Sequence, residues 1–413
     1  MENRYEKYKD SGIAWIGNIP EHWEVKRLKN VSDFNPPNDQ SISNFSEVGY
    51  LPMERLKNGY MLPSVINVYN LPQGLTFFKE NDIVMAKVTP CFENGNIAIA
   101  KNLINNCGFG SSELFIFRVR SINRKYFFYL LQEEKIKEVC KSTMIGTGGL
   151  KRISPTFMRN LLLPIPPILE QQSIAAYLDQ KCGEIDELIT LQEEMITKLQ
   201  SYKQSVITEA VTKGLDKNVP LKDSGIEWIG EIPEHWKIVC LKRLSKISTG
   251  NQDTQDSTPD GKYPFFVRSP KVERSNRYTF EGPSILMAGD GVGAGKVFHL
   301  ADNKFACHQR VYCINQFSKI NRIFLFYYLS SLFYNIIDSA NSKSTVDSVR
   351  LPMIAEFPVC IPLDLEQQSI ADYLDQRCSE IDELISIKQQ KIEKLKDYKK
   401  SLIFECVTGK RKV

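Results

Sequence analysis

One segment of the chain has the residue types of a phosphate-binding loop: the run from Gly289 to Lys296, Gly-Asp-Gly-Val-Gly-Ala-Gly-Lys. It fits the loose Gly-x-Gly-x-x-Ala form of a dinucleotide fingerprint, which places backbone amides against a pyrophosphate. It does not fit a phosphate loop, because Asp290 replaces the first glycine and Val297 replaces the hydroxyl residue. Residues 297–300 predict a strand, which offers no helix N-terminus to an anion. We therefore expect a flexible hairpin loop that can press its backbone against a ligand.

Metal binding and nucleophilic catalysis are the second kind of chemistry that the residue types could support. The chain has ten cysteines, none in a Cys-x-x-Cys pair, and four histidines, of which His22 and His235 are repeated copies. Neither has a cysteine or histidine at ligand spacing, so we expect no metal site and reduced, buried thiols. Carboxylates such as Glu113 and Asp290 show no pairing that recurs, and no Ser–His–Asp or Cys–His arrangement can be argued. The sequence predicts a non-catalytic chain that binds no cofactor itself.

Two blocks of the sequence occur twice. Residues 9–23 return at 222–236 with two differences in fifteen positions, and residues 169–189 return at 365–385 with three differences in twenty-one. Between the blocks the two halves diverge almost completely, as expected where loops and surfaces are free to vary. A repeat of about 200 residues is a tandem duplication of domains and not a solenoid. The chain therefore presents two different variable units on one framework.

The second block predicts helix. Apart from Gly183, no glycine or proline occurs between Glu170 and Gly214, and apolar residues recur at the 3–4 spacing of a coiled-coil seam. In each copy we expect a short leading helix, about 170–181 and 366–377, running into a longer one, about 184–212 and 380–407. The longer helix spans roughly 40 Å and is poorly stable alone. The two copies should therefore pair, antiparallel if the halves are related by a pseudo-two-fold axis.

The segments between the blocks predict mixed α/β domains. Candidate strands cover 82–87, 96–100 and 114–119 in the first half, and 284–288 and 310–314 in the second. One aromatic helix follows in each half, 125–131 and 323–329, and we assign its rings to the core. Proline-rich stretches, 164–167 and 358–362, end each domain before the long helix. The expected fold class is α+β, with two such domains in a pseudo-two-fold arrangement, separated by two long antiparallel coiled-coil helices.

All four tryptophans lie in the repeated block: Trp15, Trp23, Trp228 and Trp236. Exposed indoles would suit base stacking. However, a surface that reads two different targets should differ between the copies, and these residues do not. We therefore expect them to pack an N-terminal strap against each domain. By the same reasoning, the repeated runs Glu170-Gln171-Gln172 and Glu366-Gln367-Gln368 form a framework or partner contact.

Size and charge narrow the class of protein. The chain has 413 residues, a net charge of +4 and a pI near 8.4, which permits nucleic-acid contact without demonstrating it. No run of about 18 apolar residues occurs, and Met1 to Lys7 lack the apolar core of a signal peptide. We expect a cytoplasmic protein with no membrane partner.

The repeated blocks and their surroundings resemble the specificity subunit of type I restriction–modification systems, over essentially the whole chain. The resemblance is carried by residues 15–23, 82–95 and 165–175. It implies two target-recognition domains, 1–165 and 217–361, and two conserved helical regions, 166–216 and 362–413. Each domain would read one half of a split double-stranded DNA site. The helices would act as a ruler, and a 40 Å spacer corresponds to about 12 base pairs at 3.4 Å per pair.

The resemblance also implies partners. The helices would dock two methyltransferase subunits, which would recruit two restriction/translocase subunits. The chemistry would then belong to these partners, with S-adenosylmethionine for adenine methylation and ATP and magnesium for translocation and cleavage. The two Glu-Gln-Gln runs are the candidate docking residues.

Residues that contact DNA are expected in loops beside strands, where Arg suits guanine, Asn and Gln suit adenine, and Lys suits phosphate. The first half offers Lys87, Asn94, Asn96, Ser111, Ser112, Lys151 and Arg152. The second half offers Arg268, Arg274, Arg277, Lys296, His308, Gln309, Lys343 and Ser344.

Two other hypotheses stay open. One is a protein–protein scaffold whose helices bridge partners and whose variable domains bind peptides. The other is a nucleotide-using enzyme that depends on the glycine-rich run. Sequence-selective DNA binding would argue against the first, and ATP binding by the isolated chain would favour the second.

Overall fold

Two long helices, α4 (Ile168–Lys213) and α8 (Asp364–Val407), are the framework of the protein. The computed structural model describes residues 4–38, 45–147, 149–340 and 348–413. The expected division of each copy into a leading and a longer helix is wrong, because the two helices run unbroken for 46 and 44 residues. Gly183 lies inside α4 between buried Cys182 and Ile185. An interior glycine costs only about 1 kcal/mol relative to alanine, which such packing offsets.

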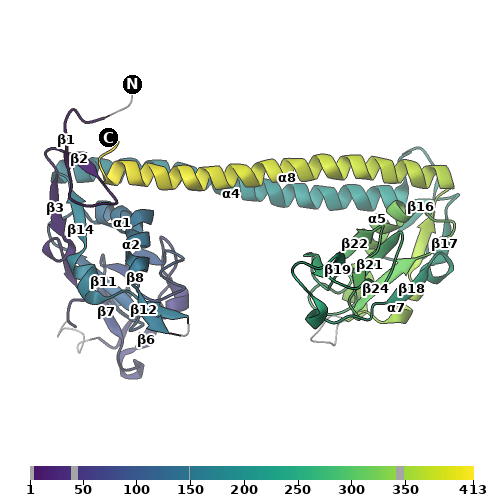
Figure 1. The fold of residues 1–413 in the computed structure, drawn as a ribbon, viewed down its shortest axis with the longest axis horizontal. Helices are drawn as coiled ribbons and strands as arrows, with labels where there is room; N and C mark the ends of the chain where they lie inside the picture. The colour runs from purple at the N-terminus through teal and green to yellow at the C-terminus, as the bar shows by residue number, and fades with distance from the viewer. Residues whose placement is uncertain (1–3, 39–44, 148, 341–347) are drawn as a thin grey trace. The chain divides into compact units, whose positions relative to one another are not determined.

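The chain divides into unit 1 (residues 1–192 and 390–413) and unit 2 (residues 193–389), so each unit contains parts of both helices. In unit 1 the start of α4 runs antiparallel to the end of α8 (Figure 1). Lys399 Nζ donates to Asp186 at 2.7 Å, and Arg411, just beyond α8, donates to the Tyr177 hydroxyl at 3.2 Å. The four consecutive regions predicted from the sequence do not follow this division, because each long helix is shared between the two units.

Unit 2 repeats the pairing with the roles of the helices exchanged. Lys203 of α4 donates to Asp382 of α8 at 2.6 Å, and Lys388 Nζ lies 3.3 Å from the Met195 sulfur. Lys203 is the counterpart of Lys399, so in both units a lysine at a seam position reaches an aspartate on the other helix. Polar residues at seam positions fix the register of paired helices. Within the described parts of the chain, every helix is too short or too polar to cross a membrane.

Unit 1 contains a domain built on two four-stranded sheets. The central sheet has the order β4-β11-β8-β9 (Ser32–Phe34, Leu114–Val119, Ile83–Ala86, Ile97–Ile99) and is antiparallel throughout. The second sheet has the order β6-β5-β10-β7 (Ser64–Asn67, Glu47–Leu51, Cys107–Gly110, Thr76–Lys79). Three ladders complete the strands: β1-β2 (Tyr8–Asp10, Asn18–Pro20), β3-β14 (Glu24–Arg27, Leu162–Ile165) and β12-β13 (Ile145–Thr147, Leu150–Arg152). The helices are α1 (Arg124–Gln132), α2 (Glu134–Ser142) and α3 (Pro155–Asn160).

The domain of unit 2 has the same central sheet in the same order, β18-β24-β21-β22 (Lys246–Thr249, Val311–Asn315, Ser284–Ala288, Phe298–Ala301). Its second sheet has three strands, β20-β19-β23 (Glu273–Ser275, Tyr263–Phe266, Ala306–Cys307). The ladders are β15-β16 (Leu221–Asp223, Glu231–Pro233) and β17-β25 (Lys237–Cys240, Pro358–Ile361). The helices are α5 (Arg322–Leu332), α6 (Tyr334–Ala340) and α7 (Leu351–Ala355).

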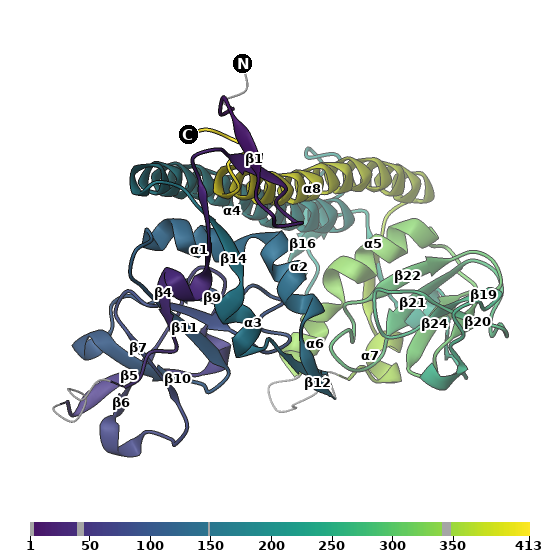
Figure 2. The same ribbon diagram turned by 60° about the vertical axis from the view of Figure 1, so that its left-hand side comes forward.

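The aromatic helices join each sheet to the long helices. In unit 1, α1 lies between the central sheet and α4 (Figure 2), and its Tyr126 and Phe127 are fully buried. In unit 2, Phe324 and Tyr328 of α5 are equally buried. The predicted strands and both aromatic helices are therefore confirmed, with ends that differ by at most three residues. The expected α+β class, with two mixed domains and two long helices, is also confirmed.

Candidate nucleic-acid interface

Each repeated strap is fastened to the start of a long helix by a buried tryptophan. Trp23 is fully buried, and its Nε1 donates to Glu170 at 3.0 Å; the Tyr5 hydroxyl donates to the same carboxylate at 3.0 Å. Burial, with the charge of Glu170, raises the pKa of Tyr5, so the phenol remains a donor. Trp236, also fully buried, repeats the bond to Glu366 at 3.0 Å. The predicted packing of the strap tryptophans is confirmed.

The first glutamine of each Glu-Gln-Gln run is also engaged within the chain. Gln171 accepts from the amide of Asn123, the N-cap of α1, at 2.7 Å and donates to the carbonyl of Pro166 at 2.7 Å. Gln367 makes the same two bonds, to the Asn321 amide and the Pro362 carbonyl, at 2.6 and 3.0 Å. Gln171 and Gln367 are nearly inaccessible, whereas Gln172 and Gln368 are exposed. The framework interpretation therefore holds for Gln171 and Gln367.

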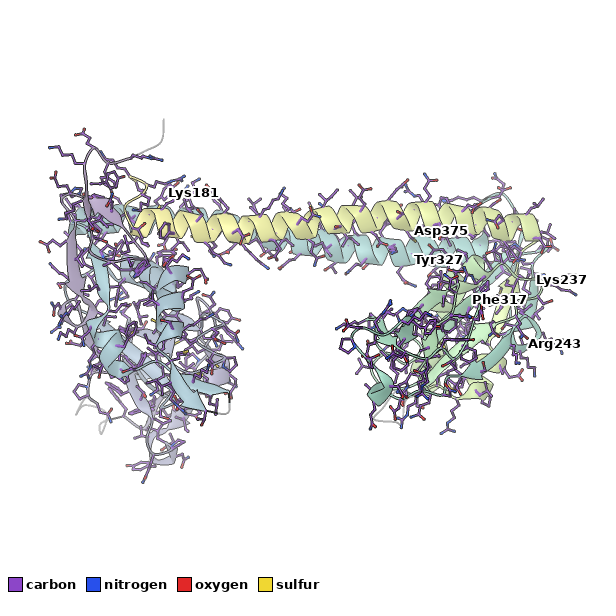
Figure 3. All side chains as sticks on the ribbon, viewed as in Figure 1. Lys181, Lys237, Arg243, Phe317, Tyr327 and Asp375 are labelled. Carbon is purple, nitrogen blue, oxygen red and sulfur yellow. The ribbon has the colours of Figure 1, made fainter. Side chains whose placement is uncertain are left out.

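A third repeated contact ties each aromatic helix to a long helix. In unit 2 the Tyr327 hydroxyl donates to Asp375 at 2.8 Å, and Figure 3 labels both residues. In unit 1 the Tyr129 hydroxyl donates to Asp179 at 2.9 Å. Burial raises the pKa of both phenols, which keeps them as donors. The duplicated blocks thus hold each domain in the same way, and the parts that differ between the domains lie elsewhere.

The seven residues predicted for the first half lie at one end of the central sheet. Lys87 directly follows β8, Asn94 and Asn96 lie in the loop before β9, and Ser111 and Ser112 precede β11. The hairpin β12-β13 reaches the same end through a bridge between Val88 and Arg152. We call this set the first polar edge: Lys87, Asn94, Asn96, Ser111, Ser112, Lys151 and Arg152.

One carboxylate organises the first polar edge. Arg152 donates from Nε to both oxygens of Glu113, at 3.0 and 2.9 Å, and its terminal nitrogen lies 2.8 Å from the same carboxylate. This hydrogen bonding lowers the pKa of Glu113 below its usual value. Lys87 Nζ donates to the carbonyl of Ser112 at 2.7 Å. Two cations are therefore held at fixed places on an exposed edge, beside hydroxyl and amide side chains.

The second domain has a comparable set at the same end of its central sheet. Asp290 and Lys296 lie in the loop between β21 and β22, and Gln309 and Arg310 precede β24. Arg268 follows β19 and donates to Asp290 at 2.9 Å, while Arg310 donates to the other oxygen at 2.5 Å. Burial raises the pKa of Asp290, but hydrogen bonds from Arg310 and Arg268 outweigh it and leave the pKa lowered. We call Arg268, Asp290, Lys296, Gln309 and Arg310 the second polar edge.

Other predicted residues of the second half lie differently. His308 is 2% exposed, and its Nδ1 accepts from the Arg310 amide at 3.0 Å while Nε2 lies 3.2 Å from Asp253. Arg274 donates to the carbonyls of Gly261 and Lys262, at 2.8 and 3.1 Å. Arg277 is exposed and pairs with Asp256 at 2.9 Å. Lys343 and Ser344 fall outside the described residues.

Sequence reasoning missed the two carboxylates that position arginines, Glu113 and Asp290, and it missed Arg310. Both acids were dismissed because no pairing recurs, and the structure shows why: Glu113 precedes β11 whereas Asp290 follows β21. Glu113 directly follows the predicted Ser112, but Asp290 lies between two glycines. The arginines that bind these acids are 20 to 39 positions away in the sequence, so a local pattern does not indicate the pairing.

The structure disfavours nucleotide binding at the glycine-rich run. The run is followed by strand β22, as the sequence predicts, and not by a helix. Over residues 4–38, 45–147, 149–340 and 348–413, no cluster of His, Cys, Asp and Glu could hold a metal ion. Both polar edges offer hydrogen-bonding groups and charge, which suit polar base edges and phosphates.

Comparison with known proteins gives one consistent answer. The family described as type I restriction modification DNA specificity domain matches residues 20–200 and 233–397. The type I restriction enzyme EcoAI specificity subunit of Escherichia coli is 30% identical over 232 residues, which are 55% of this chain and 38% of that subunit. A putative specificity subunit, MjaX, of Methanocaldococcus jannaschii is 26% identical over 430 residues, covering 96% of both chains.

Solved structures agree on the fold. A chain from a study of complex assembly and conformational transition in the type I restriction–modification system has a TM-score of 0.75 at 17% identity, covering 94% of this chain and 98% of that chain. The HsdS subunit from Thermoanaerobacter tengcongensis has a TM-score of 0.52 at 18% identity, covering 95% and 98%. The family match covers most of both domains and of both long helices. The chain therefore belongs to the family of type I restriction–modification specificity subunits.

Proposed function

We propose that this specificity subunit reads a bipartite, asymmetric DNA site, one half with each domain. The observation that carries the proposal is that the two polar edges occupy the same end of the same sheet topology with different residues. Shared topology gives each domain one way to face a groove. Different side chains then demand different base sequences, so a palindromic target is not expected.

The chemistry of the edges suits base recognition. An arginine reads guanine best through two parallel N–H donors, and a carboxylate that fixes the guanidinium lowers the entropy lost on binding. Glu113 fixes Arg152 in this way, and Asp290 fixes Arg268 and Arg310. Gln309, Asn94 and Asn96 have the amide groups that suit adenine. We assign His308 to support of the edge, because its buried ring is already hydrogen-bonded on both sides.

We propose that the helices carry the partners. Outward-facing apolar residues recur on both helices at equivalent places: Leu188, Leu191 and Tyr398 in unit 1, and Leu384, Ile387 and Tyr202 in unit 2, each more than 40% exposed. Three exposed apolar residues in each unit support a binding surface, because exposed apolar side chains that gather on one element are typical of such surfaces. We assign one methyltransferase subunit to each set, with restriction/translocase subunits attached through them. Glu170, Gln171, Glu366 and Gln367 then shape the framework, and only Gln172 and Gln368 of the six candidates remain exposed for docking.

Methyl transfer, translocation and cleavage belong to the partners in this proposal, with their S-adenosylmethionine, ATP and magnesium. Each polar edge then has one task, which is to select the DNA that the partners modify. ATP binding by the purified chain alone would contradict this division of labour.

A domain exchange tests the proposal. Residues 25–160 are replaced by those of a relative with a known target, and the full complex is expressed with its methyltransferase. Methylome sequencing should show that one half-site changes and the other remains. A change in both half-sites, or no sequence-selective methylation or binding at low salt, would contradict bipartite reading and favour the scaffold hypothesis.

A matched insertion tests the ruler. One heptad added to both α4 and α8 lengthens the pair by about 10 Å, or about 3 base pairs. The spacer of the methylated site should lengthen by that amount while both half-sites keep their sequence. Altered half-sites with an unchanged spacer would show that the helices do not set the separation.

A further inference from the structure

A single apolar side chain stands out in the second polar edge. Val292 lies at the tip of the loop between β21 and β22 and is 93% exposed. It lies two residues after Asp290, whose carboxylate accepts hydrogen bonds from Arg268 and Arg310. An exposed valine contributes almost nothing to the folded core, and isolated ones are common on surfaces. Whether this side chain has a role in binding therefore depends on how rigidly the loop positions it.

The loop is held firmly at its base. Ala294 is fully buried, and Gly295, at φ +63°, is so close to the core that a Cβ would lie 2.1 Å from Ile337 Cδ1. A Cβ at Gly293 would lie 2.5 Å from the Arg268 carbonyl oxygen, and one at Gly289 would lie 2.9 Å from that of Arg310. The glycines thus let the loop press between the two arginine segments. The tip, and the valine on it, are positioned by the same packing that positions the arginines.

The equivalent loop of the first domain has a different tip. Between β8 and β9, Phe92 is buried and anchors the loop, while Glu93 and Asn94 are exposed. The first domain therefore presents polar atoms where the second presents two methyl groups. This is the kind of difference expected where two domains read different bases from one topology.

We infer that Val292 is a specificity-determining residue that contacts the C5-methyl group of a thymine in the half-site read by unit 2. The inference rests on the proposed function. In the major groove the thymine methyl is the apolar group that a side chain can distinguish. Arginines on both sides suit the same groove, because they pair with guanine edges there. Valine is also shorter than the Phe, Leu, Ile or Met wedges that enter the minor groove.

Uracil substitution tests the contact directly, because uracil differs from thymine only by the lost methyl. The full chain is assembled with its methyltransferase, and the target is identified by methylome sequencing. Each thymine in both strands of the second half-site is then replaced in turn by deoxyuridine, and Kd is measured. At one position the wild type should bind about fourfold more weakly, the equivalent of one buried methyl.

The Val292→Ser variant should lose sensitivity to uracil at that position and keep its selectivity for the first half-site. Val65→Ser, an equally small change at an exposed valine of unit 1 (57% exposed), should retain the uracil effect. Equal affinity for every uracil duplex, a second half-site without a sensitive thymine, or uracil sensitivity that persists in Val292→Ser would each overturn the inference. Loss of all sequence-selective binding by the wild type would instead contradict the proposed function.

Discussion

The indole Nε1 of fully buried Trp23 donates a hydrogen bond to the carboxylate of Glu170 at 3.0 Å. The two residues are 147 positions apart, and each lies in one of the two duplicated blocks. Trp236 and Glu366 repeat the bond at the same distance. The two copies of each block are therefore nearly identical because the blocks join a strap to a helix. The Trp–Glu hydrogen bond fixes where each domain begins.

The first prediction concerns this bond. Glu170→Ala leaves the buried indole N–H of Trp23 without its acceptor, so the free energy of unfolding should fall by about 1–3 kcal/mol. Glu187→Ala, a control on an exposed face of the same helix, should change it by less than about 0.5 kcal/mol. Urea titration followed by tryptophan fluorescence measures both. Equal losses in the two variants would show that the bond contributes nothing specific.

The sequence predicted the elements because their signals are local. The 3–4 spacing of apolar residues around Cys182 and Ile185 indicated the long helices, and short apolar runs such as 284–288 indicated strands. The predicted break between a leading and a longer helix near Gly183 was wrong, because a helix tolerates a glycine where the neighbouring side chains are packed. Local sequence patterns therefore predict that a helix or strand is present better than they predict whether it runs without a break.

The contacts within the candidate interface were less predictable. Nothing near Asp290 in the sequence indicates that Arg268 and Arg310, about twenty residues away on either side, reach its two oxygens. Nor does the sequence show that His308 is buried while the adjacent Gln309 is exposed. Residue type predicts which bonds a side chain can make, but the fold decides which side chains face solvent.

The second prediction separates the two polar edges. Arg152→Ala should weaken discrimination at one position of the first half-site by about five- to 150-fold and leave the second half-site unchanged. Arg268→Ala should do the reverse. Arg120→Ala is the control, because Arg120 follows the other end of β11 and pairs with Asp33. Binding selections on randomised half-sites measure all three variants. Discrimination lost in both half-sites from either single variant would contradict independent reading.

The third prediction concerns pH. The pKa of Asp290 is lowered in the folded state, so its ionised form stabilises unit 2 above the ordinary carboxyl value of 3.8. The stability advantage of the wild type over Asp290→Asn should therefore be complete at neutral pH and shrink as pH falls below 3.8 through the lowered value. Asp260→Asn, at an exposed carboxylate of the same unit, is the matched control variant. Urea denaturation at a series of pH values measures the free energy of unfolding of each variant. A stability advantage of the wild type that grows on acidification would contradict the lowered pKa of Asp290.

The last prediction concerns the end of α8 in unit 1. Gly409 has φ +71°, and a Cβ there would lie 2.3 Å from Pro20 Cδ, beside Trp23. Gly12 has φ +69°, but a Cβ there would meet nothing within 4 Å. Both alanine variants therefore carry the same left-handed backbone penalty, about 1–2 kcal/mol, and only Gly409→Ala adds a clash.

Gly409→Ala should consequently destabilise unit 1 more than Gly12→Ala does, as measured by urea titration. The extra loss should come from displacement of the chain end, because Lys410 donates to the Asn18 carbonyl and the Tyr126 hydroxyl donates to the Val407 carbonyl at 3.1 Å. Tryptophan fluorescence should report the displacement at Trp23. If the two variants lose equal stability, the chain end yields without disturbing the strap, and the contact between Gly409 and Pro20 does not hold unit 1 together.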